Sequence, residues 1–466
     1  MSKSPKYLIG AFLASAIFLT MCAVWTSRAT ADTMDKDAIA EETNAPQFPE
    51  IKEAFDRFIK RDLKGTKKIL EAAVKDHPEL PPMEVLMAEF YLAARQPQGV
   101  RPWLQKAVTE HPEDPAAYIM MGRLDAKSGL TVEAWLLLEK ANTLMAKAKL
   151  GEKQKKNMQT AINSQLAQLA MMRENWEEAK KYLYELLNED AANVVALQLL
   201  AGVFFEEGNT EKALDKLLNA KSVAQREGKP MLTPQALMGQ WYEKKKDRRN
   251  ATEMMKKAIE AAPDDFLTRL AVADWAFRTK QFKEAGKEAE KALALARSQK
   301  KELKDLIETL LLAGNIAIFN KDYDAAEKYL REAWEKAPSN FHVSNNFALV
   351  LCEQDDKDKL SKALNLAQIN AQINQNEPEA FSTMGRVLYK SDRLKEAEQY
   401  LAQAINIARK TGKGISPDTA YYLAVIYADT NRVKEAKETL RKALDSEGLF
   451  SQREAAEKRL QQLNAK

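Results

Sequence analysis

The chain has 466 residues, of which 45% are hydrophobic and 30% are charged, and its formal net charge is +4. Hydrophobic content near the globular average excludes a wholly disordered chain, and a mean hydropathy of −0.47 excludes a polytopic membrane protein. Two cysteines and three histidines exclude a disulfide scaffold and leave little material for a metal centre.

The N-terminal segment 1–31 has the three parts of a secretory signal. Basic residues precede an apolar run at 8–25, and Ala29 and Ala31 form a small-x-small triplet that predicts cleavage after Ala31. The apolar run is also just long enough to span a bilayer, so a retained signal anchor is the alternative. Lipidation at Cys22 is a third alternative, which Met21 before it disfavours. All three place the body of the chain outside the cytoplasm.

Residues 32–46 carry five acidic residues against one lysine and lack helical periodicity. We expect a flexible acidic tether there. Cleavage of the signal would leave Cys352 as the only thiol of the chain. An internal disulfide is then impossible, so the fold must be held together by packing alone.

A repeat of 34 residues runs through 47–450. Its eleven windows begin at positions 47, 81, 115, 160, 194, 232, 266, 307, 341, 378 and 417. The eighth residue of every window is Gly or Ala: Ala54, Ala88, Gly122, Ala167, Ala201, Gly239, Ala273, Gly314, Ala348, Gly385 and Ala424. When a three-residue insertion in the ninth window is counted, the twentieth residue is Ala in all windows except the first two, which have Thr66 and Val100. The twenty-seventh is Ala in all but the fourth and ninth.

Small residues at this spacing let two antiparallel helices, A and B, cross closely within each window. The pattern, with Gly314, Ala326, Ala333 and Pro338 in one window, resembles the tetratricopeptide repeat (TPR). The resemblance implies an all-α fold, a right-handed superhelical solenoid of about eleven helix pairs over 47–450. Residues 451–466 are predicted to form a C-terminal capping helix, because solenoids need a polar-backed end for solubility.

Residues that could carry chemistry are scarce. His77 and His111 precede prolines and His342 is isolated, so no His-Glu-x-x-His or Cys-x-x-Cys pair can hold a metal. Gly412-Lys413-Gly414 lacks the other residues of a phosphate-binding loop. We predict no catalytic residue, no metal and no cofactor. Interspersed acids and the predicted export also argue against nucleic-acid binding.

The resemblance implies a binding groove lined by the second, fifth, ninth and twelfth residues of each window. Amides there can bond a peptide backbone and aromatic rings can cover its side chains. The candidate groove residues are Gln168, Gln240, Asn315, His342, Asn345, Tyr389 and Tyr421. The alternative is that they are merely partly exposed helix residues. Leu311 replaces the first cation of the carboxylate clamp found in one TPR subclass, so a clamp is not expected.

These features favour a non-catalytic scaffold of the bacterial periplasm or cell envelope that binds a protein or peptide partner in its groove. Exported proteins similar to this one serve outer-membrane assembly, secretion, pilus or exopolysaccharide machinery, and the sequence does not choose among these. The segment 8–25 would supply a membrane tether if it is retained. The alternative function is a holdase-like periplasmic chaperone for extended exported chains.

Overall fold

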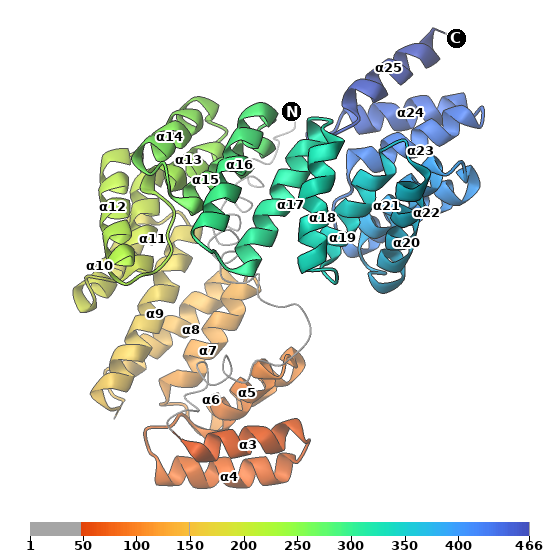
Figure 1. Ribbon diagram of the computed structural model, residues 1–466. Helices are drawn as coiled ribbons and strands as arrows, with labels where there is room; N and C mark the ends of the chain where they lie inside the picture. Colours follow the sequence, from red (N-terminus) through yellow and green to blue (C-terminus); the bar gives the residue numbers. More distant parts are fainter. Residues whose placement is uncertain (1–47, 149, 466) are drawn as a thin grey trace, which may run out of the picture. The chain divides into compact units, whose positions relative to one another are not determined.

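The computed structural model describes residues 48–148 and 150–465, and every regular element in these ranges is a helix. The predicted signal segment 1–31 and tether 32–46 lie outside the described residues. No helix in the described part is both long enough and apolar enough to span a bilayer. Within the described ranges the fold is the expected all-helical superhelical solenoid, with eleven helix pairs followed by one further helix (Figure 1).

The described part of the chain divides into two compact units, and the division falls between Pro230 and Met231. Unit 1 contains five pairs: α3 (Pro49–Ile59) and α4 (Leu63–Asp76), α5 (Met83–Ala93) and α6 (Val100–Glu110), α7 (Pro115–Lys127) and α8 (Thr131–Met145), α9 (Glu152–Met172) and α10 (Trp176–Glu189), and α11 (Val194–Glu206) and α12 (Thr210–Arg226). A short 3₁₀ turn, η1 (Pro97–Gly99), precedes α6.

Unit 2 contains six pairs and the final helix. They are α13 (Pro234–Lys244) and α14 (Arg248–Ala261), α15 (Phe266–Arg278) and α16 (Phe282–Ser298), α17 (Leu303–Phe319) and α18 (Tyr323–Lys336), α19 (Phe341–Cys352) and α20 (Lys357–Ile373), α21 (Pro378–Lys390) and α22 (Leu394–Thr411), α23 (Pro417–Asp429) and α24 (Val433–Leu444), and α25 (Arg453–Asn464). In each pair the first helix is helix A and the second is helix B.

Helix starts follow from capping residues in the sequence. Asp322 precedes α18 and its carboxylate accepts a hydrogen bond from the backbone N–H of Ala325 at 3.1 Å. Asp247 does the same for Asn250 at the start of α14, also at 3.1 Å. Such caps satisfy backbone donors that have no partner within the helix. Short polar residues therefore fix where many of the B helices begin.

The small residues of the repeat lie where helices A and B cross. A Cβ atom added to Gly314 would lie 2.6 Å from Cγ of Leu330, and one added to Gly385 would lie 2.6 Å from Cγ of Leu401. Both distances are far below van der Waals contact, so each leucine packs directly on the glycine backbone. Thr66, one of the exceptions, is buried and donates its hydroxyl hydrogen bond to the carbonyl of Asp62 at 2.8 Å.

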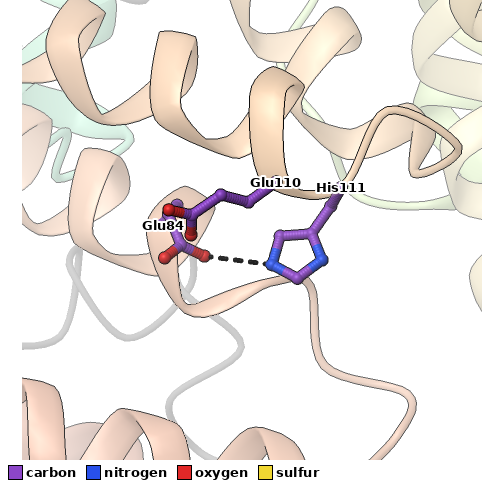
Figure 2. Close-up of side chains that lie close together, drawn as sticks. All are labelled: Glu84, Glu110 and His111. Atoms are coloured by element: carbon purple, nitrogen blue, oxygen red, sulfur yellow. Dashed lines mark ion pairs between the residues drawn. The ribbon is translucent and has the colours of Figure 1, made fainter.

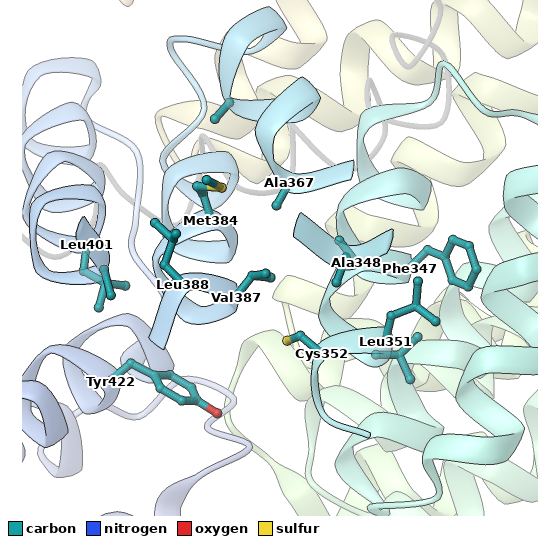
Figure 3. Packing of buried hydrophobic residues seen from close by; sticks show 14 of the residues in the cluster. Phe347, Ala348, Leu351, Cys352, Ala367, Met384, Val387, Leu388, Leu401 and Tyr422 are labelled. Carbon is teal, nitrogen blue, oxygen red and sulfur yellow. The ribbon is translucent and has the colours of Figure 1, made fainter. Parts of the chain in front are cut away.

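One core region of unit 2 joins α19, α21 and their neighbours. Phe347, Leu351 and Cys352 of α19 pack with Val387 and Leu388 of α21 (Figure 3). The Cys352 thiol is fully enclosed, and burial raises its pKa to about 12. A thiol that is buried and stays protonated at neutral pH packs as a small hydrophobic side chain and is not a nucleophile.

Candidate peptide-binding face

The A helices of unit 2 pack against one another in series. Each A helix from α13 to α23 contacts the next A helix along the chain. In stacked-repeat proteins such a layer lines an extended binding surface. We call the exposed side of α17, α19, α21 and α23 the A-helix face.

A buried carboxylate lies beneath this face. Glu353 follows the last residue of α19, and its Oε1 accepts hydrogen bonds from Nε of Arg386 at 2.7 Å and from the hydroxyl of Tyr422 at 3.1 Å. Its Oε2 lies 3.2 Å from Nζ of Lys390. Burial alone would raise the pKa of Glu353, but Arg386 and Lys390 outweigh burial and lower it. The carboxylate is therefore ionised and fully paired.

The paired cation is enclosed as well. The Arg386 guanidinium lies 4.8 Å from the ring centroid of Tyr422, within cation–π range. Burial raises the pKa of Tyr422 well above its ordinary value, so its hydroxyl keeps the proton that it donates to Glu353. These residues come from α19, α21 and α23, and they fix the relative positions of three successive A helices.

The two predicted groove tyrosines pack against Tyr422 of this buried network. Tyr389 of α21 and Tyr421 of α23 both pack on the ring of Tyr422, with centroid distances of 5.6 and 5.1 Å. The Tyr389 hydroxyl donates to Oδ2 of Asp429 at 3.3 Å, and burial followed by the Asp429 charge raises the pKa of Tyr389 to about 12. Both rings are partly exposed.

Asparagines on α17 and α19 form a second group on the same face. Asn346 of α19 donates from Nδ2 to Oδ1 of Asn315 on α17 at 2.8 Å, and both are partly exposed. Asn345, in contrast, is only 4% exposed, and its Oδ1 has no hydrogen-bond partner. The structure thus places Asn315 within reach of a ligand but encloses Asn345.

The remaining candidates are dispersed. Gln168 lies on α9 of unit 1 and Gln240 on α13 of unit 2, both partly exposed. His342 is exposed at the start of α19, where its ring lies 5.2 Å from that of Phe341. Of the candidates, Asn315, Tyr389 and Tyr421 thus combine partial exposure with side-chain contacts to another residue of the A-helix face.

A cluster in unit 1 has metal-ligand residue types. The ligand atoms of Glu84, Glu110 and His111 lie within 4.8 Å of one another (Figure 2). However, Nζ of Lys106 lies 3.0 Å from Glu84 and 3.4 Å from Glu110. The hydrogen bond from Lys106 helps to lower the pKa of Glu84 against the opposing effect of burial. The lysine ammonium therefore supplies the positive charge that a metal ion would bring, and the cluster is an ion-pair network.

The sequence did not single out Glu353 or Lys390. Both are ordinary charged residues at helix ends, and nothing in a 34-residue period distinguishes a buried acid from the solvated ones. The spacing does place Arg386 at a ninth position, which the resemblance assigns to the groove. A charged residue at a groove position, close to the groove tyrosines Tyr389 and Tyr421, is the one sequence feature from which this buried ion-pair network could have been predicted.

Three segments of unit 2 match models of a known repeat family. One model described as "Tetratricopeptide repeat" matches residues 376–446, and a second of the same description matches 235–265 and 307–340. The chain carries tetratricopeptide repeats. The matched segments coincide with helix pairs of unit 2 that the structure shows, including α21 to α24. TPR arrays are scaffolds for protein–protein interaction and are generally not catalytic.

No curated protein sequence matches the chain. Among solved structures, a thermophilic TPR protein of Thermus thermophilus is 15% identical, with 43% of this chain and 100% of that chain covered and a TM-score of 0.35. Yeast Tom70 is 15% identical, with 93% and 96% covered and a TM-score of 0.35. A TPR protein of Parabacteroides merdae is 11% identical, with 58% and 98% covered and a TM-score of 0.43. Nothing about function follows from likenesses this distant.

Proposed function

We propose that this TPR protein is a non-catalytic scaffold of the bacterial cell envelope that binds an extended partner segment on the A-helix face of unit 2. The proposal rests on two partly exposed tyrosines that pack against a rigid, buried network. Tyr389 and Tyr421 are partly exposed, and both rest on Tyr422, which the buried Glu353 holds in place. Preorganised aromatic and amide groups bind a peptide at low entropic cost.

The envelope location rests on the sequence of the N-terminal segment. Its basic start, apolar run and Ala29-x-Ala31 triplet are the order that export requires. Mass spectrometry of the chain recovered from fractionated cells tests this. A chain beginning at Asp32 in the periplasm would support cleavage, and an intact chain in the membrane fraction would support an anchor. Recovery of an intact chain from the cytoplasm would overturn the location.

The binding proposal is tested by capture of partners from envelope extracts with the full chain. The double variant Asn315→Ala/Tyr389→Ala removes one amide and one ring from the face. We expect it to lose at least nine-tenths of one or two stoichiometric partners while its helical circular dichroism is unchanged. Tyr184→Ala is the matched control, since Tyr184 is 44% exposed on the B helix α10 of unit 1.

Two outcomes would overturn the proposal. Retention of the partners by the double variant would place the interface away from this face. Capture of many unrelated extended chains in substoichiometric amounts would instead favour the holdase-like chaperone, because a chaperone of that kind binds exposed apolar segments without selecting one partner.

A further inference from the structure

The segment between α24 and α25 contacts repeats that lie far earlier in unit 2. Nζ of Lys280 donates a hydrogen bond to the backbone carbonyl of Glu447 at 3.2 Å. Nζ of Lys321 lies 2.9 Å from Oε2 of Glu454, in the first turn of α25. Lys280 and Lys321 occupy the turns that join α15 to α16 and α17 to α18. Contacts in solenoids are mostly between neighbouring repeats, so this segment is unusual.

An aromatic cluster lies beside the same two turns. Phe277 lies in the last turn of α15, Phe282 is the first residue of α16 and Phe319 is the last residue of α17. Their ring centroids lie 5.1 Å apart for Phe277 and Phe319, 5.3 Å for Phe282 and Phe319, and 6.0 Å for Phe277 and Phe282. Phe282 and Phe319 are partly exposed, whereas Phe277 is buried. The cluster therefore offers an apolar surface at the edge of the array.

Leu449 packs against the hydrophobic core to which Phe277 belongs, and Phe282 and Phe319 pack against the same core. Leu449 is the only residue of 446–452 that does so, since the following Phe450 packs on its own repeat beside Tyr421. Ser451 and Gln452 are also held locally, because the carboxylate of Asp418 accepts hydrogen bonds from both. The C-terminal end of the segment is thus held by its own repeat, whereas Leu449 contacts the core of an earlier repeat.

We propose that Phe277, Phe282 and Phe319 form a leucine-binding site for extended acidic segments, and that residues 447–449 occupy it as the chain's own tethered ligand. This inference rests on the proposed function, because it assigns a second place where a partner segment can bind. The ligand chemistry is that of the resident contacts: the backbone carbonyl of Glu447 for Lys280, the Leu449 side chain for the aromatic rings, and a carboxylate for Lys321, which Glu454 supplies from the first turn of α25.

The resident contacts are few enough to exchange. They comprise one backbone hydrogen bond, one partly buried leucine, and an ion pair whose side chains are 58% and 85% exposed. Exposed ion pairs contribute little to stability. The tether compensates, since linkage gives the segment an effective concentration on the order of millimolar. A partner segment that binds more tightly than this threshold displaces residues 447–449, replaces Glu454 in the ion pair with Lys321 and leaves the repeats intact.

The test uses the full chain and a fluorescent peptide of residues 444–456. Leu449→Ala vacates the site, so we expect this variant to bind the peptide at least tenfold more tightly than the unmodified chain by fluorescence anisotropy. Adding Phe319→Ala should abolish the gain, and a peptide carrying Leu449→Ala should not bind. Leu218→Ala, at an exposed leucine of α12, is the matched control and should bind the peptide as weakly as the unmodified chain.

A second measurement covers the case in which Leu449→Ala disturbs α25. Saturating peptide added to the unmodified chain should speed amide hydrogen exchange in 446–450 without changing α24. Equal peptide affinity for the unmodified chain and Leu449→Ala, or unchanged exchange at saturation, would overturn the inference. A chain that captures its envelope partner but ignores the peptide would overturn only this inference. A chain that binds the peptide but no partner would overturn the proposed function and leave the site standing.

Discussion

The hydroxyl of Tyr422 on α23 donates a hydrogen bond of 3.1 Å to Oε1 of Glu353 at the end of α19, although 69 positions separate the two residues in the chain. Arg386 of α21 donates to the same oxygen at 2.7 Å. One buried carboxylate thus joins the A helices of three successive repeats. We expect α19, α21 and α23 to unfold more cooperatively than repeats that contact only their nearest neighbours.

Removing the carboxylate should therefore be costly. Glu353→Ala leaves the Arg386 guanidinium buried without its counter-charge, and we expect a loss of about 3–5 kcal/mol in the unfolding free energy of this region. Hydrogen exchange of α19, α21 and α23 measures the effect locally. Glu335→Ala, at an exposed acid of α18, is the control and should change stability by less than about 0.5 kcal/mol. Similar effects for the two variants would show that the network adds no stability.

Two glycine-to-alanine changes should act with opposite signs. Gly314→Ala places a Cβ 2.6 Å from Cγ of Leu330, so the two helices must move apart, and we expect destabilisation of about 1–3 kcal/mol. Gly286→Ala, inside α16, brings its Cβ no closer than 3.7 Å to any neighbour. It should stabilise the chain by about 0.5–1 kcal/mol because alanine loses less backbone entropy in a helix. Thermal unfolding compares the two, and a shift of the same sign would contradict the packing argument.

The turn between α9 and α10 holds Glu174 in the left-handed backbone region, with φ of 55°. Glycine adopts this conformation without steric cost, so Glu174→Gly should stabilise unit 1 by about 0.5–1 kcal/mol. Glu174→Val at the same position should instead destabilise it, because β-branched residues are disfavoured at positive φ. Denaturant midpoints of the two variants provide the measurement. A loss of stability in Glu174→Gly would mean that the carboxylate makes a contact that matters more than the strain.

Acid should weaken unit 2 partly through Glu327. Burial would raise the pKa of Glu327, but Lys359 at 2.8 Å, Gln354 at 2.7 Å and Arg331 lower it to about 2, from an ordinary value of 4.5. A lowered pKa contributes stability that is complete above about pH 4.5 and is lost as pH falls toward 2. We expect this contribution to be on the order of 2 kcal/mol after allowing for partial solvent screening.

The variant Glu327→Gln isolates this effect. Its stability deficit relative to the unmodified chain should be full at pH 6 and shrink steadily below pH 4.5, as measured by denaturant unfolding at each pH. Glu335→Gln, the exposed control, should show no such trend. A deficit for Glu327→Gln that stays constant down to pH 2.5 would mean that hydrogen bonding rather than charge holds Glu327 in place.

The sequence by itself was enough to predict the helix pairs. Gly314 and Ala326 occur at repeat positions where only small side chains allow helices A and B to cross, and residues such as Asp322 cap the helix that follows. These are contacts within one repeat or between neighbours, so a period of 34 residues is sufficient to reveal them. The solenoid and its eleven pairs follow from that local repetition.

Only the tertiary structure decided which polar residues are reachable. Asn315 and Asn345 are both groove positions by spacing, yet Asn345 is buried and Asn315 is not. Likewise, the period cannot reveal that Glu353 meets Tyr422 or that Leu449 reaches the core beside Phe277. Such contacts span more than one repeat, and they depend on the small rotation between neighbouring helix pairs. That rotation accumulates from side-chain packing along the array, so it is fixed only when all the repeats are stacked.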